Sequence, residues 1–292
     1  MDFIRLPEHP RPEPPPGFTA VQIFDDQTPN AVIQKRIIRH SMEVAARFSD
    51  LERQEGDDFI NLIILIGRKM ASVYRYLQGY HAEEARLIEK FSDASVKHFD
   101  ASQVLYEEFD VFAVQIKSTL DHLVKIMRPM IGRRWTMYTF GDKGDAVLRA
   151  LKGNTGKKHH GRVRAMEHLL FSKQHRLWLE AIIETRDRVN HGIAGGLDIR
   201  NFVVRRTAEG NVELPMWSKE ERLAAVMDAI WVQFFNFVQD FIMLALHFRI
   251  PEDRFGVFKK PDPPITAEHS PWVVVAKAEA DRIIKELGAT PL

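Results

Sequence analysis

A short segment in the second half of the chain carries the side chains best suited to chemistry. It reads Thr185-Arg186-Asp187-Arg188-Val189-Asn190-His191-Gly192. In a helix, Arg186 and Asn190 lie one turn apart. Asp187 and His191 have the same spacing, so the four side chains share one face. A guanidinium, a carboxylate and an imidazole on one face are the groups needed to hold a phosphodiester and to move a proton.

The apolar residues around this segment predict how its helix is used. Trp178 and Ile182 begin a stripe at helical spacing that would pack against a bundle. Leu179 and Ile183 fall on the face that carries the polar residues. We therefore expect this second face to meet a partner helix, most simply the same helix of a second subunit. The alternative is a surface Arg–Asp pair followed by His191 at a helix C-terminus, where the helix dipole favours a protonated ring.

The segment resembles the motif of the HEPN superfamily (higher eukaryotes and prokaryotes nucleotide-binding), whose small helical bundles carry Arg, a polar residue, three further positions and His. Here these are Arg186, Asp187, residues 188–190 and His191. An earlier stretch, Ser118-Thr119-Leu120-Asp121-His122-Leu123, resembles the first long helix of many such proteins. The resemblance covers roughly residues 107–247, with a hairpin inserted after the motif, and leaves residues 1–100 and the tail unmatched.

The resemblance implies a metal-independent endoribonuclease of toxin or antiviral-defence type, working as a dimer whose two motifs line one cleft. Arg186 would neutralise the non-bridging phosphate oxygens. His191 would deprotonate the ribose 2′-OH or protonate the leaving 5′ oxygen, and Asp187 would orient one of these groups. Asn190 and Asp121 are expected to support the site, although Asp121 also fits a position on a helix surface.

The implied partners are RNA, a second copy of the chain, and an antitoxin or defence-system component. No cofactor or metal is expected, since the chain has no helix with two metal-binding histidines at same-face spacing. The alternative function, from another class, is a non-catalytic HEPN-like helical module that binds a protein partner or a nucleotide.

Residues 149–164, which read RALKGNTGKKHHGRVR, form a basic connector without an acidic residue. Lys157, Lys158, Arg162 and Arg164 are its candidate contacts to RNA phosphates. The alternative is a solvated loop. Residues 153–158 imitate half of a phosphate-binding loop, but no Ser or Thr follows the Lys and no strand precedes it, which excludes nucleotide hydrolysis of that type.

Composition limits the remaining classes of protein. The chain of 292 residues contains no Cys, which excludes disulfides, thiolate zinc sites and a Cys nucleophile, and which fits a cytoplasmic location. The net charge of +1 neither requires nor excludes nucleic acid. Polar residues at 233, 236, 239 and 240 interrupt the most apolar run, Ala229 to Phe248, so we expect a buried helix there and no membrane span.

The predicted fold is all-α: a helical bundle with a small β-hairpin after the Arg-x4-His helix. We divide it into an extended Pro-rich arm (1–30), a helical region (31–100), a HEPN-like bundle (101–250, with the hairpin at 201–214) and a Pro-rich tail with a short helix (251–292). The expected helices cover residues 31–51, 59–79, 83–99, 102–130, 145–151, 162–171, 173–191, 218–247 and 272–287. A polar break is predicted at 54–58, and a capping box of Ser218 and Glu221 is predicted to begin the helix over 218–247.

Overall fold

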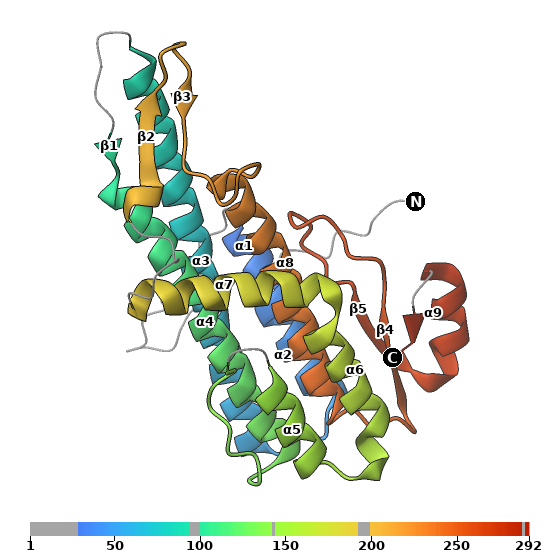
Figure 1. Ribbon diagram of the computed structural model, residues 1–292. Helices are drawn as coiled ribbons and strands as arrows, with labels where there is room; N and C mark the ends of the chain where they lie inside the picture. The colour runs from blue at the N-terminus through green and yellow to red at the C-terminus, as the bar shows by residue number, and fades with distance from the viewer. Residues whose placement is uncertain (1–28, 94–99, 142–143, 192–198, 288–289, 292) are drawn as a thin grey trace, which may run out of the picture.

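The structure, a computed structural model, is a mostly helical bundle with small antiparallel sheets (Figure 1). It describes residues 29–93, 100–141, 144–191, 199–287 and 290–291, and at residues 186–191 it describes the backbone but not the side chains. The predicted all-α bundle with a hairpin after the Arg-x4-His helix is confirmed. The predicted arm over residues 1–30 lies almost entirely outside the described residues.

The centre of the bundle is an antiparallel pair of long helices, α3 (Arg53–Ser92) and α4 (Gln103–Ile131), which pack along most of their length. Their buried residues follow helical spacing, so each helix presents one apolar face to the other. The remaining helices are α1 (Asn30–Val32), the π-helical η1 (Ile33–Arg39), α2 (His40–Phe48), α5 (Asp145–Asn154), α6 (His160–Phe171), α7 (Lys173–His191), α8 (Leu223–His247) and α9 (Ala280–Leu287). Short 3-10 segments are η2 (Lys157–His159), η3 (Ile199–Phe202) and η4 (Lys277–Glu279).

The prediction of two helices over 59–79 and 83–99 was wrong, because α3 is continuous. Gly79 lies inside it, where α4 approaches closely: a Cβ atom there would lie 2.6 Å from the carboxylate carbon of Glu108. Gly79 therefore lies at a contact between α3 and α4 and does not end a helix. The predicted polar break at 54–58 forms the first turns of α3. Glu52 is the N-cap residue, and it makes a capping box with Glu55 in the first turn.

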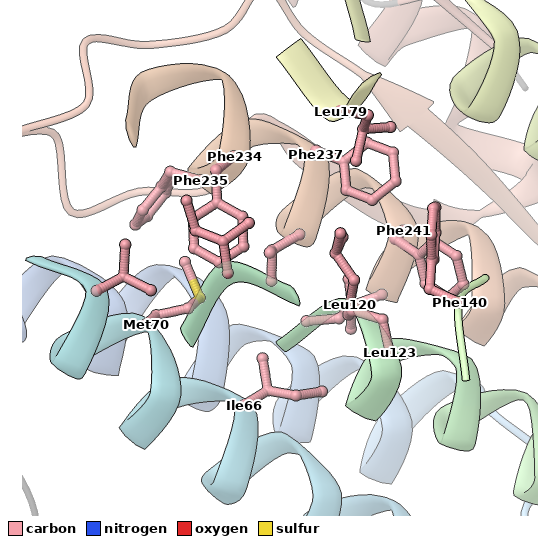
Figure 2. Packing of buried hydrophobic residues seen from close by; sticks show 14 of the residues in the cluster. Ile66, Met70, Leu120, Leu123, Phe140, Leu179, Phe234, Phe235, Phe237 and Phe241 are labelled. Carbon is pink, nitrogen blue, oxygen red and sulfur yellow. The ribbon is translucent and has the colours of Figure 1, made fainter. Parts of the chain in front are cut away.

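Helix α8 lies in the core and is surrounded by other elements. Every residue from Phe237 to His247 is buried, and Figure 2 shows the phenylalanines of α8 meeting side chains of α3 and α4. Among the described helices, α8 alone is long and apolar enough to cross a membrane, and 78% of its most apolar window is buried inside the protein. The predicted capping box did not form: Met216 bridges to Arg222, and the helix begins after that bridge.

Asn236, Gln239 and Asp240 of α8 are paired with residues near the two ends of the described chain. The guanidinium of Arg36 donates to the side-chain oxygens of Gln239 and Asn236, the latter at 3.2 Å. Asp240 accepts hydrogen bonds from Nζ of Lys259 at 2.7 Å and from the indole N–H of Trp272 at 2.9 Å. These contacts fasten the N-terminal helix and the C-terminal strands to α8.

Two small antiparallel sheets complete the part of the fold that the structure describes. The first has the order β1 (Asp100–Ala101), β2 (Val203–Arg206), β3 (Val212–Glu213), and the β2–β3 pair is the hairpin predicted at 201–214. The second has the order β5 (Trp272–Ala276), β4 (Phe255–Lys259), β6 (Thr290–Pro291) and was not predicted.

The tail was expected to be helical from Trp272 to residue 287, and that prediction was wrong for its first part. Residues 272–276 form β5, with Trp272 and Val274 buried and the alternating Val273 and Val275 partly exposed. Three consecutive valines favour a strand because their branched side chains fit a pleated surface. One continuous cluster of buried residues runs from Val32 to Val274. The predicted regions 31–100 and 101–250 therefore share one core.

Replacing Lys259 with Met should lower the free energy of unfolding by about 3 kcal/mol, because the buried carboxylate of Asp240 loses its counter-charge. Burial already raises the pKa of Asp240, with the Lys259 ammonium opposing that shift. In the variant the deficit should shrink as the pH falls, since a protonated carboxyl group needs no counter-charge.

The double variant Asp240→Asn/Lys259→Met is the control for that measurement, because it removes both charges and keeps an acceptor for Trp272. Urea unfolding is measured at pH 7 and pH 4. At pH 7 the double variant should be more stable than Lys259→Met alone. Equal losses in the single and double variants would show that the pair is not coupled.

Candidate functional site

The motif lies at the C-terminal end of α7. This helix is unbroken from Lys173 to His191, so the backbone has the one-turn spacing that the sequence predicts for residues 186–191. Figure 1 shows α7 crossing the bundle over α4 and α8, with its C-terminal end reaching past α4 in this view. The side chains of Arg186, Asp187, Asn190 and His191 lie outside the described part of the structure. Their convergence therefore stays a prediction.

The prediction that Leu179 and Ile183 form a dimer face was wrong. Both side chains are 2% exposed, and Figure 2 shows Leu179 pointing into the core beside Phe237. Trp178 and Ile182 are buried as well. Successive helical positions are about 100° apart, so the two apolar stripes merge into one broad face that the bundle covers from one side. A homodimer needs another surface.

Asp121 on α4 has a structural role in its described contacts. Its Oδ1 accepts the backbone N–H of Phe140 at 2.8 Å and pairs with Nζ of Lys117 at 3.0 Å. The first contact holds the segment that follows α4 against the helix, and Phe140 is fully buried. None of the contacts that the structure describes for Asp121 involves the end of α7, so its support of the site is also still a prediction.

The basic connector divides into exposed and buried residues. Lys157 and Lys158 are exposed in the turn η2 (Lys157–His159), and Arg164 is exposed on α6. These three cations are accessible to phosphates.

Arg162 differs from its neighbours, because its guanidinium is buried. Nη1 donates to the carbonyl oxygen of Phe248 at 3.1 Å and Nη2 to that of Ile250 at 2.8 Å. It binds the chain just after α8, so the prediction that Arg162 contacts RNA is corrected. Its position gave a signal: Arg162 lies one turn before Met166, on the apolar face of α6.

A cavity of about 330 Å³ between α6, α7, α8 and the second sheet was not predicted from the sequence. It is lined in part by His175, Asn236, Asp240 and Lys259. These polar groups bind one another or the core: Asn236 accepts from Arg36, Asp240 is paired with Lys259, and Nδ1 of His175 accepts from the indole of Trp178 at 3.3 Å. The cavity therefore lies where the second sheet joins α8.

A second cleft that the sequence did not predict lies where the first turns of α3 meet the last turns of α4. It has a volume of about 310 Å³ and includes Lys125, Arg128 and the half-exposed ring of Tyr138. A sequence signal existed, since Lys125 and Arg128 are one helical turn apart in an otherwise apolar segment.

The class of protein that these observations define is a helical bundle with small antiparallel sheets and a motif at the end of one crossing helix. Comparison of the chain with protein-family profiles, with curated proteins and with solved structures finds no match. The family resemblance therefore depends on the motif at 186–191 and on the long helix α4.

Two buried histidines should make the protein sensitive to acid. Burial lowers the pKa of both His175 and His247 to about 4, and the nearby charges of Lys259 and Arg162 add to this shift. Unfolded histidines titrate near pH 6.5. Between about pH 6.5 and 4 the unfolded state thus binds protons that the folded state does not, so stability falls with pH, by up to about 1.4 kcal/mol per unit for each histidine.

Urea unfolding at pH 7, 6 and 5 measures this slope. The variant His247→Gln should show a shallower fall in stability than the unsubstituted protein, whereas His168→Gln, at an exposed position, should show the same fall. The same slope in all three proteins would contradict the assignment.

A matched pair of variants tests whether Arg162 is a structural residue of the connector and Arg164 an exposed one. Arg162→Met leaves the carbonyl groups of Phe248 and Ile250 without their donor, so we expect a loss of about 2–4 kcal/mol in unfolding free energy. Arg164→Met, two residues away on the exposed face, should change it by less than about 0.5 kcal/mol. Thermal and urea unfolding compare the two, and equal losses would refute the distinction.

Proposed function

We propose that the protein is a metal-independent endoribonuclease of HEPN type that acts as a homodimer, in the role of a toxin or defence effector. The observation that carries the proposal is the backbone of α7. Trp178, Leu179, Ile182 and Ile183 are buried in the core, and the helix continues unbroken through His191. The residues of the motif therefore have the one-turn spacing that the proposed chemistry needs.

The chemistry requires a cation at the phosphate and two proton transfers. The ribose 2′ oxygen attacks phosphorus while the bond from phosphorus to the 5′ oxygen breaks, which yields a 2′,3′-cyclic phosphate and a 5′-OH. Arg186 stabilises the charge on the non-bridging oxygens. One His191 accepts the 2′ proton and the His191 of a second copy protonates the 5′ oxygen. Asp187 orients one of these groups, with Asn190 and Asp121 as supporting residues.

The exposed cations of the connector extend the proposed RNA path. Lys157, Lys158 and Arg164 are all exposed, so each can contact a phosphate without disturbing the core. Arg162 is left out of this set because its guanidinium is occupied by carbonyl groups.

A second candidate function is a non-catalytic module that binds a protein partner, such as an antitoxin or defence component. It is favoured by a groove of about 550 Å³ between α7 and α8. Leu177, Ala181, Val226 and Ile230 contribute to its apolar lining, and the side chain of Leu177 is 63% exposed. Apolar grooves between two helices are a common seat for a partner helix.

Purified protein incubated with total RNA in EDTA should cleave it and leave 2′,3′-cyclic phosphate ends. His191→Ala and Arg186→Ala should each lower the cleavage rate by at least about 100-fold, the usual effect of losing a proton-transfer or charge-stabilising group. Lys173→Ala, at the exposed first residue of the same helix, is the control and should cleave normally.

Two results would refute the nuclease: cleavage that disappears in EDTA, or unchanged cleavage in both motif variants. A substrate with a 2′-deoxyribose at the mapped cut site gives a further check, since it lacks the attacking oxygen and should stay intact. RNA that stays intact with the unsubstituted protein, together with a partner protein lost on Leu177→Asp, would favour the binding module.

A further inference from the structure

We propose that the cleft between the start of α3 and the end of α4 binds one nucleotide, an aromatic base together with its phosphate, either within single-stranded RNA or free. The RNA form of this inference rests on the proposed function, whereas the free-nucleotide form does not. The cleft is separate from the motif at the end of α7 and from the basic connector.

The floor and walls of the cleft come from three segments. Leu62 of α3, Pro129 of α4 and Met137 after α4 supply apolar surface. Tyr138 stands at the same place with its side chain 54% exposed. An exposed aromatic ring beside an apolar floor offers a flat surface on which a base can stack, and such stacking tolerates any base. Asn61 adds an amide that both donates and accepts hydrogen bonds.

The charge of the cleft favours an anion. Lys125 and Arg128 lie one turn apart on α4, and among the described residues no ion pair engages either side chain. The acidic side chain in the lining is Asp58, whose Oδ1 accepts a hydrogen bond from Gln54 at 3.1 Å. Two cations beside one carboxylate leave a net positive charge, and a guanidinium is well shaped to bind a phosphate.

The combination of groups identifies the ligand. A purely anionic ligand would not need the ring of Tyr138, and a purely apolar one would not need Lys125 and Arg128. A nucleotide uses both parts, with its base on the ring and its phosphate on the cations. The volume of about 310 Å³ lies within the range of small-ligand sites.

The test uses the full chain carrying His191→Ala, so that RNA is bound but not cut. Its affinity for a fluorescently labelled 12-nucleotide single-stranded RNA is measured by anisotropy in EDTA. Adding Tyr138→Ala should weaken binding roughly tenfold, while Tyr138→Phe should keep it because the ring remains. Adding Arg128→Gln should make the log–log dependence of affinity on salt shallower by about 0.7.

Tyr76→Ala is the matched control. Tyr76 is another tyrosine beside an arginine, but Arg75 already lies over its ring, 4.9 Å from the ring centre, and donates to its hydroxyl group. This substitution should leave RNA affinity unchanged. An equal loss for Tyr76→Ala and Tyr138→Ala would overturn the proposal.

Titration with AMP distinguishes the two sources of the nucleotide. AMP binding that is lost in Tyr138→Ala identifies a site for free nucleotides, and Tyr138-dependent RNA binding without AMP binding identifies an RNA site. The inference fails if Tyr138→Ala and Arg128→Gln bind both probes as their parent does, since Arg128 then only stabilises the C-terminus of α4. If RNA binding depends on Tyr138 while the unsubstituted protein, with His191 intact, cuts no RNA, the proposed nuclease is refuted and this binding site is supported.

Discussion

The structure depends on the complete burial of the second half of α8. The polar side chains of a helix that is covered on all sides can form hydrogen bonds only with partners inside the protein. Gln239 and Asp240 find theirs in Arg36, Lys259 and Trp272. These residues come from opposite ends of the described chain. The burial of one central helix thus decides where the N-terminal helix and the C-terminal sheet attach.

The same constraint acts at the end of α8. The chain leaves the helix through Phe248 and Ile250, whose backbone carbonyl groups lie inside the protein and receive their hydrogen bonds from Arg162. A basic residue that looks suited to RNA is therefore used for structure. The cations that remain available to RNA are the exposed ones, Lys157 and Lys158 in the turn η2 and Arg164 on α6.

Much of the fold followed from the sequence because helical periodicity is a local signal. The bounds of α4, α6 and α7 agree with the prediction to within about two residues, and the hairpin after α7 lies within the predicted residues 201–214. The prediction was wrong where contacts between residues far apart in the sequence determine the local secondary structure. Gly79 lies inside α3, close to the carboxylate of Glu108 on another helix, and the valines at 273–275 pair with a strand fifteen or more residues earlier.

The candidate site shows the same division. The sequence predicted that residues 186–191 belong to a helix, which the backbone bears out. It could not predict that Leu179 and Ile183 are covered within one subunit, because an apolar face looks the same whether its partner is the same chain or a second copy. Nor could spacing alone separate Arg162 from Arg164, since the covering residues lie more than eighty positions later.

The hydropathy of α8 also has a consequence for synthesis of the chain. Helices α3 and α4, which receive α8, are made before it, whereas Lys259 and Trp272 are made after it. A newly made α8 is thus an apolar segment of 25 residues whose Asp240 still lacks its partners. Asp240 lies in the last third of that segment, so it opposes insertion into a bilayer by less than the roughly 3 kcal/mol that an aspartate at the centre would cost. The residue that fastens the second sheet to α8 in the folded protein thus also disfavours insertion of the unfinished helix into a membrane.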